Sequence, residues 1–495
     1  MTQVRHNIWN LGTPQDPWHP ITLGYALGVR AMQALPVTDP RSWTYQAAIH
    51  GTYLTSRPSG APWNQCQHAT WFFVPWHRMY LFQFENILRS LLPAADQDSW
   101  ALPFWDYSSG SPGNALPTAF RLAALPDGTP NPLFVAQRRT SVNNGVALPG
   151  AVTSTAQALA NQQFTSAAQG GSIGFGGPQT GFAHQGPAFG QLEAQPHGPV
   201  HVQVGGSGGL MTDPNTAAAD PIFWLHHANI DRLWEVWNIG GGANPNVRGW
   251  LNRAFPLRDA TGAVVRMMPR DVLDTVTQLD YTYESLPVRA GLAAREVRSV
   301  PKQRQPMLIG TNDRPVELAR HGATTTLAVT PVPESLAARA VASPRMYLDV
   351  TDIEGSRNPG VVFGVYLNLP DDLLDAVVDN PADNPTDNAC EDRADDVGGD
   401  RAAAARADHL VGLISFFGIE DTDPATAATN RKEPHGMRYS FDVTDVVDRL
   451  RAVGSWQADT IRVTLLPVTP DDEPEALAAD APAPVRVGTF NLYQG

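Results

Sequence analysis

The sequence of 495 residues contains only two cysteines, Cys66 and Cys390, and no apolar run of about 18 residues, the length that a membrane-spanning helix requires. These absences exclude a disulfide framework and a transmembrane helix. Lys and Arg number 35 against 49 for Asp and Glu, so the formal net charge is −14 and the basic footprint of a nucleic-acid-binding protein is missing. The first ten residues lack the features of a secretory signal, and we expect a cytoplasmic protein.

The composition is that of a folded, globular chain. Hydrophobic residues make up 42% of it and charged residues 17%, and it contains 42 Gly and 43 Pro. This excludes a disordered or fibrous chain, and at about 100 to 200 residues per domain the length predicts two or three domains.

The pattern of apolar residues changes near Val300. The first part is rich in Trp and His and shows helical periodicity, whereas the apolar runs of the second part are short and alternate. We therefore expect an α + β multidomain protein with a mainly helical domain over 1–283, a linker over 284–306 and a C-terminal β-sandwich over 307–495. The seven strands predicted for the sandwich are 324–330, 346–351, 361–367, 410–417, 437–443, 461–467 and 485–493.

Two acidic segments interrupt the strand-rich part. Residues 371–400 hold eleven acidic residues and one basic residue, and 467–484 have the same character. We interpret both as solvated surface loops rather than as cation sites.

Two amphipathic helices are clearly marked in the first part. One has Pro75 in its first turn and continues with apolar residues at helical spacing to Leu91. The other has Asp220 as N-cap and Pro221 as its first residue, and it ends at the glycines 240–242. Both predicted helices carry histidines.

The main functional signal is a grouping of histidines. Seven of the thirteen lie in otherwise apolar or aromatic segments: His50, His68, His77, His197, His201, His226 and His227. One such histidine is more often a core residue, but several neutral imidazoles without a carboxylate or thiolate ligand suit copper better than zinc, iron, magnesium or calcium. His197 and His201, four apart, share one face of a helix. The adjacent His226 and His227 point about 100° apart, and spacing alone does not choose between them.

At these residues the sequence resembles the tyrosinase, catechol oxidase and haemocyanin family of binuclear copper proteins. The resemblance covers residues 5–283 and rests on IHG, CQHATWFFVPWHRMYLFQFE, LPFWDY, LEAQPHGPVH, DPNTAAADPIFWLHHANIDRLW and the closing LDYTYES. It implies a four-helix bundle that holds two copper ions. One would be bound by His50, His68 and His77, and the other by His197, His201 and His227.

The same resemblance assigns roles to residues beside the ligands. Cys66 and His68 match a Cys-x-His arrangement that some members join by a thioether. Phe73 corresponds to an aromatic residue that packs over the copper site.

Three positions near the second copper also have candidate roles. Glu193 matches the residue that holds a water acting as base in family members. Gly198 stands where several strongly hydroxylating tyrosinases have Asn, so we expect weaker activity on monophenols than on diphenols. Asp231 lies one helical turn after His227 and is a candidate hydrogen-bond partner of that ring.

The resemblance implies an oxidoreductase that uses O2 and a small phenolic substrate, converts o-diphenols and in some members monophenols to o-quinones, and produces water. Two alternatives share the six ligands, namely an o-aminophenol oxidase and a haemocyanin-like oxygen-binding protein. A single copper unit fused to one C-terminal domain favours an enzyme over a carrier.

The region after the linker is expected to fold back over the helices and cover the copper pocket. A linker of this length permits such an arrangement, and related enzymes with fused caps insert a side chain as a plug. Phe416, Phe417 and Tyr493 are the candidates for a plug in this chain.

Overall fold

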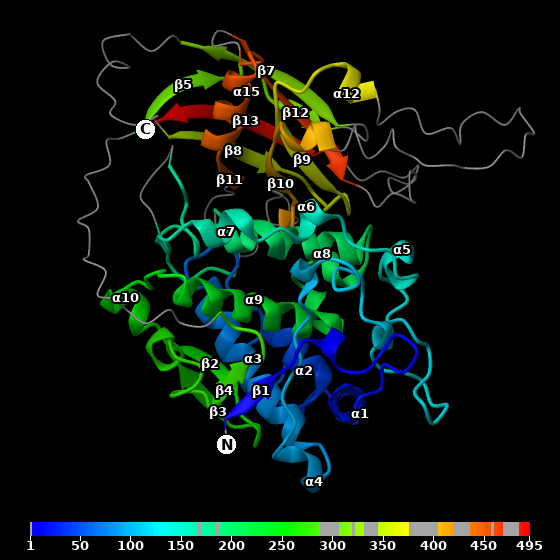
Figure 1. The fold of residues 1–495 in the computed structure, drawn as a ribbon. Helices are drawn as coiled ribbons and strands as arrows, with labels where there is room; N and C mark the ends of the chain where they lie inside the picture. The colour runs from blue at the N-terminus through cyan, green and yellow to red at the C-terminus, as the bar shows by residue number, and fades with distance from the viewer. Residues whose placement is uncertain are drawn as a thin grey trace, which may run out of the picture.

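The computed structural model describes residues 2–165, 171–184, 186, 188–287, 306–318, 322–330, 345–375, 404–419, 436–456, 460–468 and 485–495. Within them, a helical region is followed by a sheet region that lies over one side of the helices (Figure 1). Most of the predicted linker 284–306 and of the acidic segments 371–400 and 467–484 falls outside the described residues, as does Cys390.

The helical region is organised by two long helices, α3 (Phe73–Ser90) and α9 (Ile222–Ile239), of 18 residues each. They pack against each other through the stacked rings of Phe84 and Trp224, whose centroids are 3.4 Å apart. Both follow the sequence prediction closely, and the Asp220 carboxylate accepts a hydrogen bond from the N–H of Ile222 at 3.0 Å. This bond satisfies one of the free N–H groups at the start of α9.

Shorter helices surround this pair. α1 (Pro20–Ala34) lies beside α3, and α2 (Trp43–His50) and α8 (Gly198–Gly205) have eight residues each. The remaining α-helices of this region are α4 (Ala94–Gln97), α5 (Thr140–Asn143), α6 (Gly150–Thr153), α7 (Ala156–Ala160) and α10 (Arg248–Leu251). The irregular turns are η1 (Ile8–Asn10), η2 (Tyr107–Ser109), η3 (Thr118–Phe120), η4 (Glu193–His197), η5 (Leu210–Thr212), η6 (Ala217–Ala219) and η7 (Pro269–Asp271). A regular four-helix bundle is not confirmed, because α2 and α8 are too short to run alongside α3 and α9.

Two small sheets complete the helical region. β1 (Gln3–Arg5) pairs in parallel with β4 (Tyr281–Tyr283), with Arg5 opposite Tyr283. β2 (Phe255–Arg258) and β3 (Val264–Met267) form an antiparallel pair. The first pair joins the two ends of the helical region. No helix in the described part of the chain combines the length and apolar character needed to cross a bilayer.

The C-terminal region is built on one nine-stranded sheet, in the order β10-β9-β12-β7-β5-β13-β8-β11, with β6 also paired to β13. The strands are β5 (Met307–Thr311), β6 (Val316–Leu318), β7 (Ala323–Val329), β8 (Met346–Glu354), β9 (Val362–Leu367), β10 (Leu410–Ile414), β11 (Met437–Asp442), β12 (Thr460–Val468) and β13 (Val485–Gln494). Two helices accompany them, α12 (Asp372–Asp375) and α15 (Thr444–Ala452).

This sheet differs from the sandwich that the sequence predicted. All seven predicted strands are present, but the hydrogen-bonded ladder is continuous, because β12 pairs with both β7 and β9 and β5 pairs with both β13 and β7. Two separate sheets are therefore not present among the described residues. Alternation of apolar residues indicates which strands have a buried face, but not how they close on one another.

The sheet region meets the helices through β9, β10 and the loop that follows β10, which lie over α8 and η4 (Figure 1). Val362, Leu413 and Phe417 belong to the same buried apolar cluster as the cores of α3 and α9. In the other direction, Ala69 and Phe189 of the helical region are buried in the core of the sheet region. The contact is thus a shared core.

Candidate metal centre

The seven histidines singled out in the sequence all lie in the helical region, and none is more than 2% exposed. His50 ends α2, His68 lies in the loop before α3, and His77 lies in α3. His197 ends η4, His201 lies in α8, and His226 and His227 lie in the first half of α9. Segments far apart in the sequence thus bring these rings to one place.

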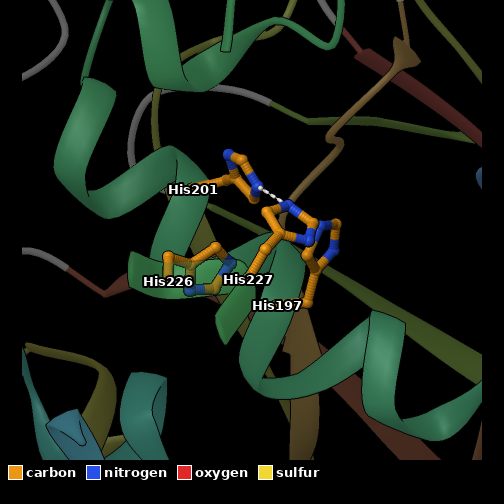
Figure 2. A group of neighbouring side chains, drawn as sticks. All are labelled: His197, His201, His226 and His227. Carbon is orange, nitrogen blue, oxygen red and sulfur yellow. Dashed lines mark hydrogen bonds between the residues drawn. The ribbon is translucent and has the colours of Figure 1, made fainter. Parts of the chain in front are cut away.

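The rings form two adjoining groups. Ring centroids in the first, His50, His68 and His77, are 5.0 to 5.5 Å apart. In the second, His197, His201 and His227, they are 4.6 to 5.4 Å apart, and Figure 2 shows these rings beside His226. The groups touch where His77 stacks on His227 at 4.3 Å.

The protonation of three rings is fixed by the main chain. The Nδ1–H groups of His50, His77 and His201 donate to the carbonyl oxygens of Pro214, Phe73 and Met211 at 2.8 to 2.9 Å. Their Nε2 atoms therefore carry lone pairs. This hydrogen bonding from the far nitrogen is what orients metal-binding histidines in proteins.

Most of these ring nitrogens meet no hydrogen-bonding group in the described part of the chain. Among the described residues, buried Nε2 atoms of His50, His68, His77 and His197 lack a hydrogen-bond partner. The Nε2 atom of His201 faces that of His227 at 3.2 Å (Figure 2). Buried polar atoms are rarely left in this way unless an ion or water satisfies them.

Burial also keeps these rings neutral. Desolvation lowers the pKa of all seven histidines, to about 3 for His77 and for His201 and well below the ordinary value for the other five. No carboxylate belongs to the groups of described side chains that are close enough to share an ion. A set of neutral nitrogens without oxygen ligands fits copper, and the residues present therefore fit the metal that the sequence suggested.

Two of the neighbouring residues lie where the sequence predicted. The Phe73 ring is 4.7 Å from the rings of His77 and His197, between the two groups. The Sγ atom of Cys66 lies 3.3 Å from Nδ1 of His68, and the predicted thioether stays a prediction. The Nδ1 atom of His184 lies 3.0 Å from the same sulfur. Sequence reasoning missed His184 because its glycine-rich segment has no motif or periodicity.

Asp231 does not contact His227, and the predicted hydrogen bond between them is wrong. Its carboxylate instead accepts hydrogen bonds from Arg78, Arg5, Tyr281 and Tyr283. Burial raises the pKa of Asp231, but the two guanidinium charges outweigh this and hold the pKa below its ordinary value. The long arginine side chains reach this carboxylate from β1 and α3, which local spacing on α9 does not reveal.

Glu193 is buried on η4, four residues before His197. Both its oxygens accept the N–H of Ala69, at 2.8 and 2.9 Å, so the side chain ties η4 to the loop that carries His68. Burial raises the pKa of Glu193 well above its ordinary value, and the N–H of Ala69 opposes this only in part.

Gly198 lies against the sheet region. A Cβ atom at this position would stand 2.5 Å from Oγ of Ser415, which follows β10. A side chain at this position therefore requires Ser415 to move. The residue that follows His197 is in this way also a point of contact with the C-terminal region.

Phe417 covers the histidines. Its ring stacks on His201 at 4.3 Å and lies edge-on to His68 and His197, each at 5.4 Å, and it is 1% exposed. The loop turns at Phe416, which has a φ of 55°, a left-handed conformation that non-glycine residues seldom adopt. This turn sends Phe416 into the core of the sheet region, where it meets Phe363, and Phe417 toward the metal centre.

Tyr493, the third candidate for a plug, lies within the sheet. It sits on β13 opposite Tyr347 of β8 and Leu308 of β5. No ring contact of the described histidines involves it. Of the three candidates, Phe417 is the one whose ring touches the histidines.

A buried set of imidazoles covered by an aromatic ring is thus a candidate metal centre whose nitrogen ligands suit copper. Family models place this chain more closely. The common central domain of tyrosinase matches residues 40–239, the polyphenol oxidase middle domain matches 246–292, and a domain of unknown function matches 396–494.

The relatives cover the whole chain. A tyrosinase, HcTyr1 of Hahella sp. (strain CCB-MM4), is 32% identical over 507 residues, which cover 95% of this chain and 96% of the relative. A chloroplastic polyphenol oxidase of Malus domestica is 29% identical and covers 70% of this chain, with 63% of the relative matched. The chain belongs to the tyrosinase family. It is an oxidoreductase of the tyrosinase and catechol oxidase type, and the family's chemistry is copper-dependent oxidation of phenols.

Solved structures share the fold. The structure of a latent apple tyrosinase has a TM-score of 0.57 at 22% identity and covers 100% of this chain and 97% of its own. A tyrosinase from Burkholderia thailandensis, solved at low pH, has a TM-score of 0.54 at 18% identity and covers 94% of this chain and 95% of its own. The likeness extends over both the helical and the sheet regions.

Proposed function

We propose that this chain binds two copper ions and oxidises o-diphenols to o-quinones while dioxygen is reduced to water. One ion would be held by His50, His68 and His77. The other would be held by His197, His201 and His227. The observation that carries the proposal is the convergence of these six buried, neutral imidazoles in two adjoining groups of three.

The protein's part in the reaction is to hold, orient and seclude. Copper, when bound, supplies electron exchange between a phenol and dioxygen. The main-chain carbonyls of Pro214, Phe73 and Met211 fix three of the rings so that their lone pairs are directed to the metal. The rings of Phe73 and Phe223 pack on the histidines, Phe223 at 4.2 Å from His227, and keep bulk water away.

Diphenols are the proposed substrates and monophenols the poorer ones. A monophenol must lose its proton to a nearby base before it can act as an anionic ligand. The obvious base, Glu193, has both carboxylate oxygens bonded to the N–H of Ala69. Gly198 offers no polar side chain to assist. Both features support weak hydroxylation of monophenols.

We also propose that residues 307–495 form a cap, joined through the linker 284–306 to the catalytic domain 1–283. Phe417 would act as the plug, because its ring occupies the open side of the histidine groups. A phenol ring could approach these imidazoles only after Phe417 withdraws. The intact chain would therefore be latent.

The test is to load the purified chain with copper, cleave it within 284–306, and measure dioxygen consumption with catechol, tyramine and 2-aminophenol. Metal analysis should give two copper ions per chain before and after cleavage. Cleavage should raise the rate with catechol, and tyramine should remain slower. Reversible dioxygen binding without turnover of any of the three would replace the oxidase with a carrier. Faster turnover of 2-aminophenol than of catechol would replace the proposed substrate.

A further inference from the structure

One buried histidine has no role in the arrangement proposed above. His226 precedes His227 on α9 and is 0% exposed. Neither of its ring nitrogens has a hydrogen-bond partner among the described residues. Burying two polar atoms in this way is unfavourable, and an ordinary packing position would be filled better by an apolar side chain.

His226 is as close to the second group as His227 is. Its ring centroid lies 4.7 Å from that of His201 and 5.4 Å from that of His197, whereas His227 lies 5.4 and 5.0 Å from the same two rings. One nitrogen from each of these four residues can be chosen so that all lie within 4.8 Å of one another (Figure 2). The four side chains thus offer one nitrogen more than a three-coordinate ion needs.

His227 also belongs to the other side of the centre. Its ligand nitrogen lies within 4.8 Å of nitrogens of His50 and His77, and its ring stacks on His77. Among the described residues, His226 belongs to no second group of possible ligands. Apart from histidines, the ring beside it is that of Tyr107, at 5.6 Å. Unlike His201, whose Nδ1–H is fixed by the carbonyl of Met211, His226 has no described bond that fixes its tautomer, so either of its nitrogens can carry the lone pair.

We propose that His226 is a further copper ligand, which acts while the centre is being loaded. With His197 and His201 it forms a three-nitrogen site that receives the incoming second copper ion. His227 then replaces His226 as the third nitrogen, and the exchange breaks one copper–nitrogen bond as another forms. This inference rests on the proposed function, because it requires two copper ions in the finished centre.

The experiment follows copper uptake by the full-length, metal-free chain after mixing with copper(II) sulfate. Samples are taken over time, freed of unbound metal, and analysed for copper content and by EPR. His226→Asn and His226→Leu are compared with the parent chain. His409→Asn is the matched control, because His409 is a buried histidine of the sheet region whose Nδ1–H donates to the carbonyl of Leu367 at 2.8 Å.

Both His226 variants should acquire the second ion at least tenfold more slowly than the parent, and yet reach the parent's final copper content. The EPR spectrum recorded early, while the second ion is being taken up, should also differ between the parent and His226→Asn. His409→Asn should load at the parent rate. Circular dichroism of the metal-free proteins identifies a variant that fails to fold. If one His226 variant fails, the EPR spectrum of the folded variant is compared with that of the parent.

The outcomes separate the two proposals. Uptake of both ions at the parent rate in a folded His226 variant, with an unchanged early EPR spectrum, would overturn the role of His226 and leave the oxidase intact. A parent chain that never takes up a second copper ion would instead overturn the two-copper function itself.

Discussion

The two sides of the histidine cluster are held by different kinds of contact. On the side of α3 and β1, the Asp231 carboxylate of α9 is buried between Arg5 and Arg78 and two tyrosine hydroxyls. On the side of the sheet region, the described contacts include packed rings and neutral hydrogen bonds to main-chain carbonyls, such as that from Gln157 to Val411 at 2.7 Å.

The difference indicates which side can move. Separating a buried ion pair leaves a charge without a partner, whereas neutral hydrogen bonds and ring contacts can be exchanged for water at lower cost. The helices below the centre should therefore stay fixed while the cap detaches. The predictions that follow test this contrast, beginning with the histidines that lie between the two sides.

Replacing any of the six proposed ligands with alanine should cause the largest effect. Each copper needs three nitrogens, so the loss of one should remove bound copper and lower catechol turnover more than a thousandfold, a figure on the order of that seen when essential catalytic groups are removed. Metal analysis and dioxygen consumption measure both. His226→Gln is the neighbouring control and should retain two copper ions at equilibrium. If the His226 variant instead binds one copper and is inactive while the His227 variant stays active, the assignment of His226 and His227 would be reversed.

Asp231→Asn should destabilise the chain by about 3 to 5 kcal/mol, because it leaves Arg5 and Arg78 buried with one partner fewer. Urea unfolding of the metal-free protein measures this. The matched control is Asp127→Asn, since Asp127 forms an exposed pair with Arg30 at 3.9 Å and its loss should change stability much less.

The difference in stability between the parent and Asp231→Asn should depend on pH in a defined direction. The folded pKa of Asp231 is lowered, so its contribution is complete above the unfolded value of about 3.9 and is lost as pH falls through the folded pKa. The stability gap between the parent and Asp231→Asn should therefore be constant from pH 7 to 5 and narrow only in stronger acid. A gap that already closes between pH 7 and 5 would contradict the ionised carboxylate.

Phe417→Ala should raise catechol turnover of the intact chain by roughly tenfold or more, because it removes a buried aromatic contact that holds the cap closed. Copper content should not change. Tyr493→Phe, a change within the sheet, serves as the control and should leave turnover as it was. If Phe417→Ala accelerates the cleaved chain by the same factor, the effect lies in the substrate pocket and the plug is refuted.

Peptide mass spectrometry tests the link between Cys66 and His68. A thioether removes two hydrogens relative to the free thiol and imidazole, so the peptide that contains both residues should be lighter by that amount. Alkylation of Cys66 in the copper-loaded chain would show that the sulfur is free.

The smallest effect should come from a single neutral contact of the cap. Gln157→Ala removes one hydrogen bond to the carbonyl of Val411, which is worth about 1 kcal/mol, and should raise turnover of the intact chain by up to about fivefold. After cleavage within 284–306 the same substitution should have no effect. If Gln157→Ala destabilised the metal-free chain as much as Asp231→Asn does, the two sides would not differ in the strength of their contacts.

The sequence predicted those features that depend on repeated local patterns. Helices α3 and α9, the seven longest or most alternating strands, and the histidine set were all visible in spacing and composition. Phe417 was one of three aromatic candidates for the plug, and the sequence did not choose among them.

Features that depend on distant partners were not predictable in this way. The carboxylate of Asp231 turned to Arg5, which lies 226 positions away in the chain, and not to His227 one turn away. His184 meets Cys66 across 118 positions from a segment without a pattern. The closure of the nine strands into one ladder likewise depends on pairings such as that of β5 with β7, which no single strand specifies.

The close approach of Gly198 to Ser415 has a consequence for how such chains diverge. Position 198 follows His197 of the second histidine group, and the space beside it is already taken by Ser415 of the sheet region. A related chain that acquires a polar side chain at 198 must therefore also change residue 415, or the sheet region would pack less closely against the helices. Substrate range and latency would then evolve together, because two positions 217 residues apart affect both properties. A substitution at one of them would require a compensating substitution at the other.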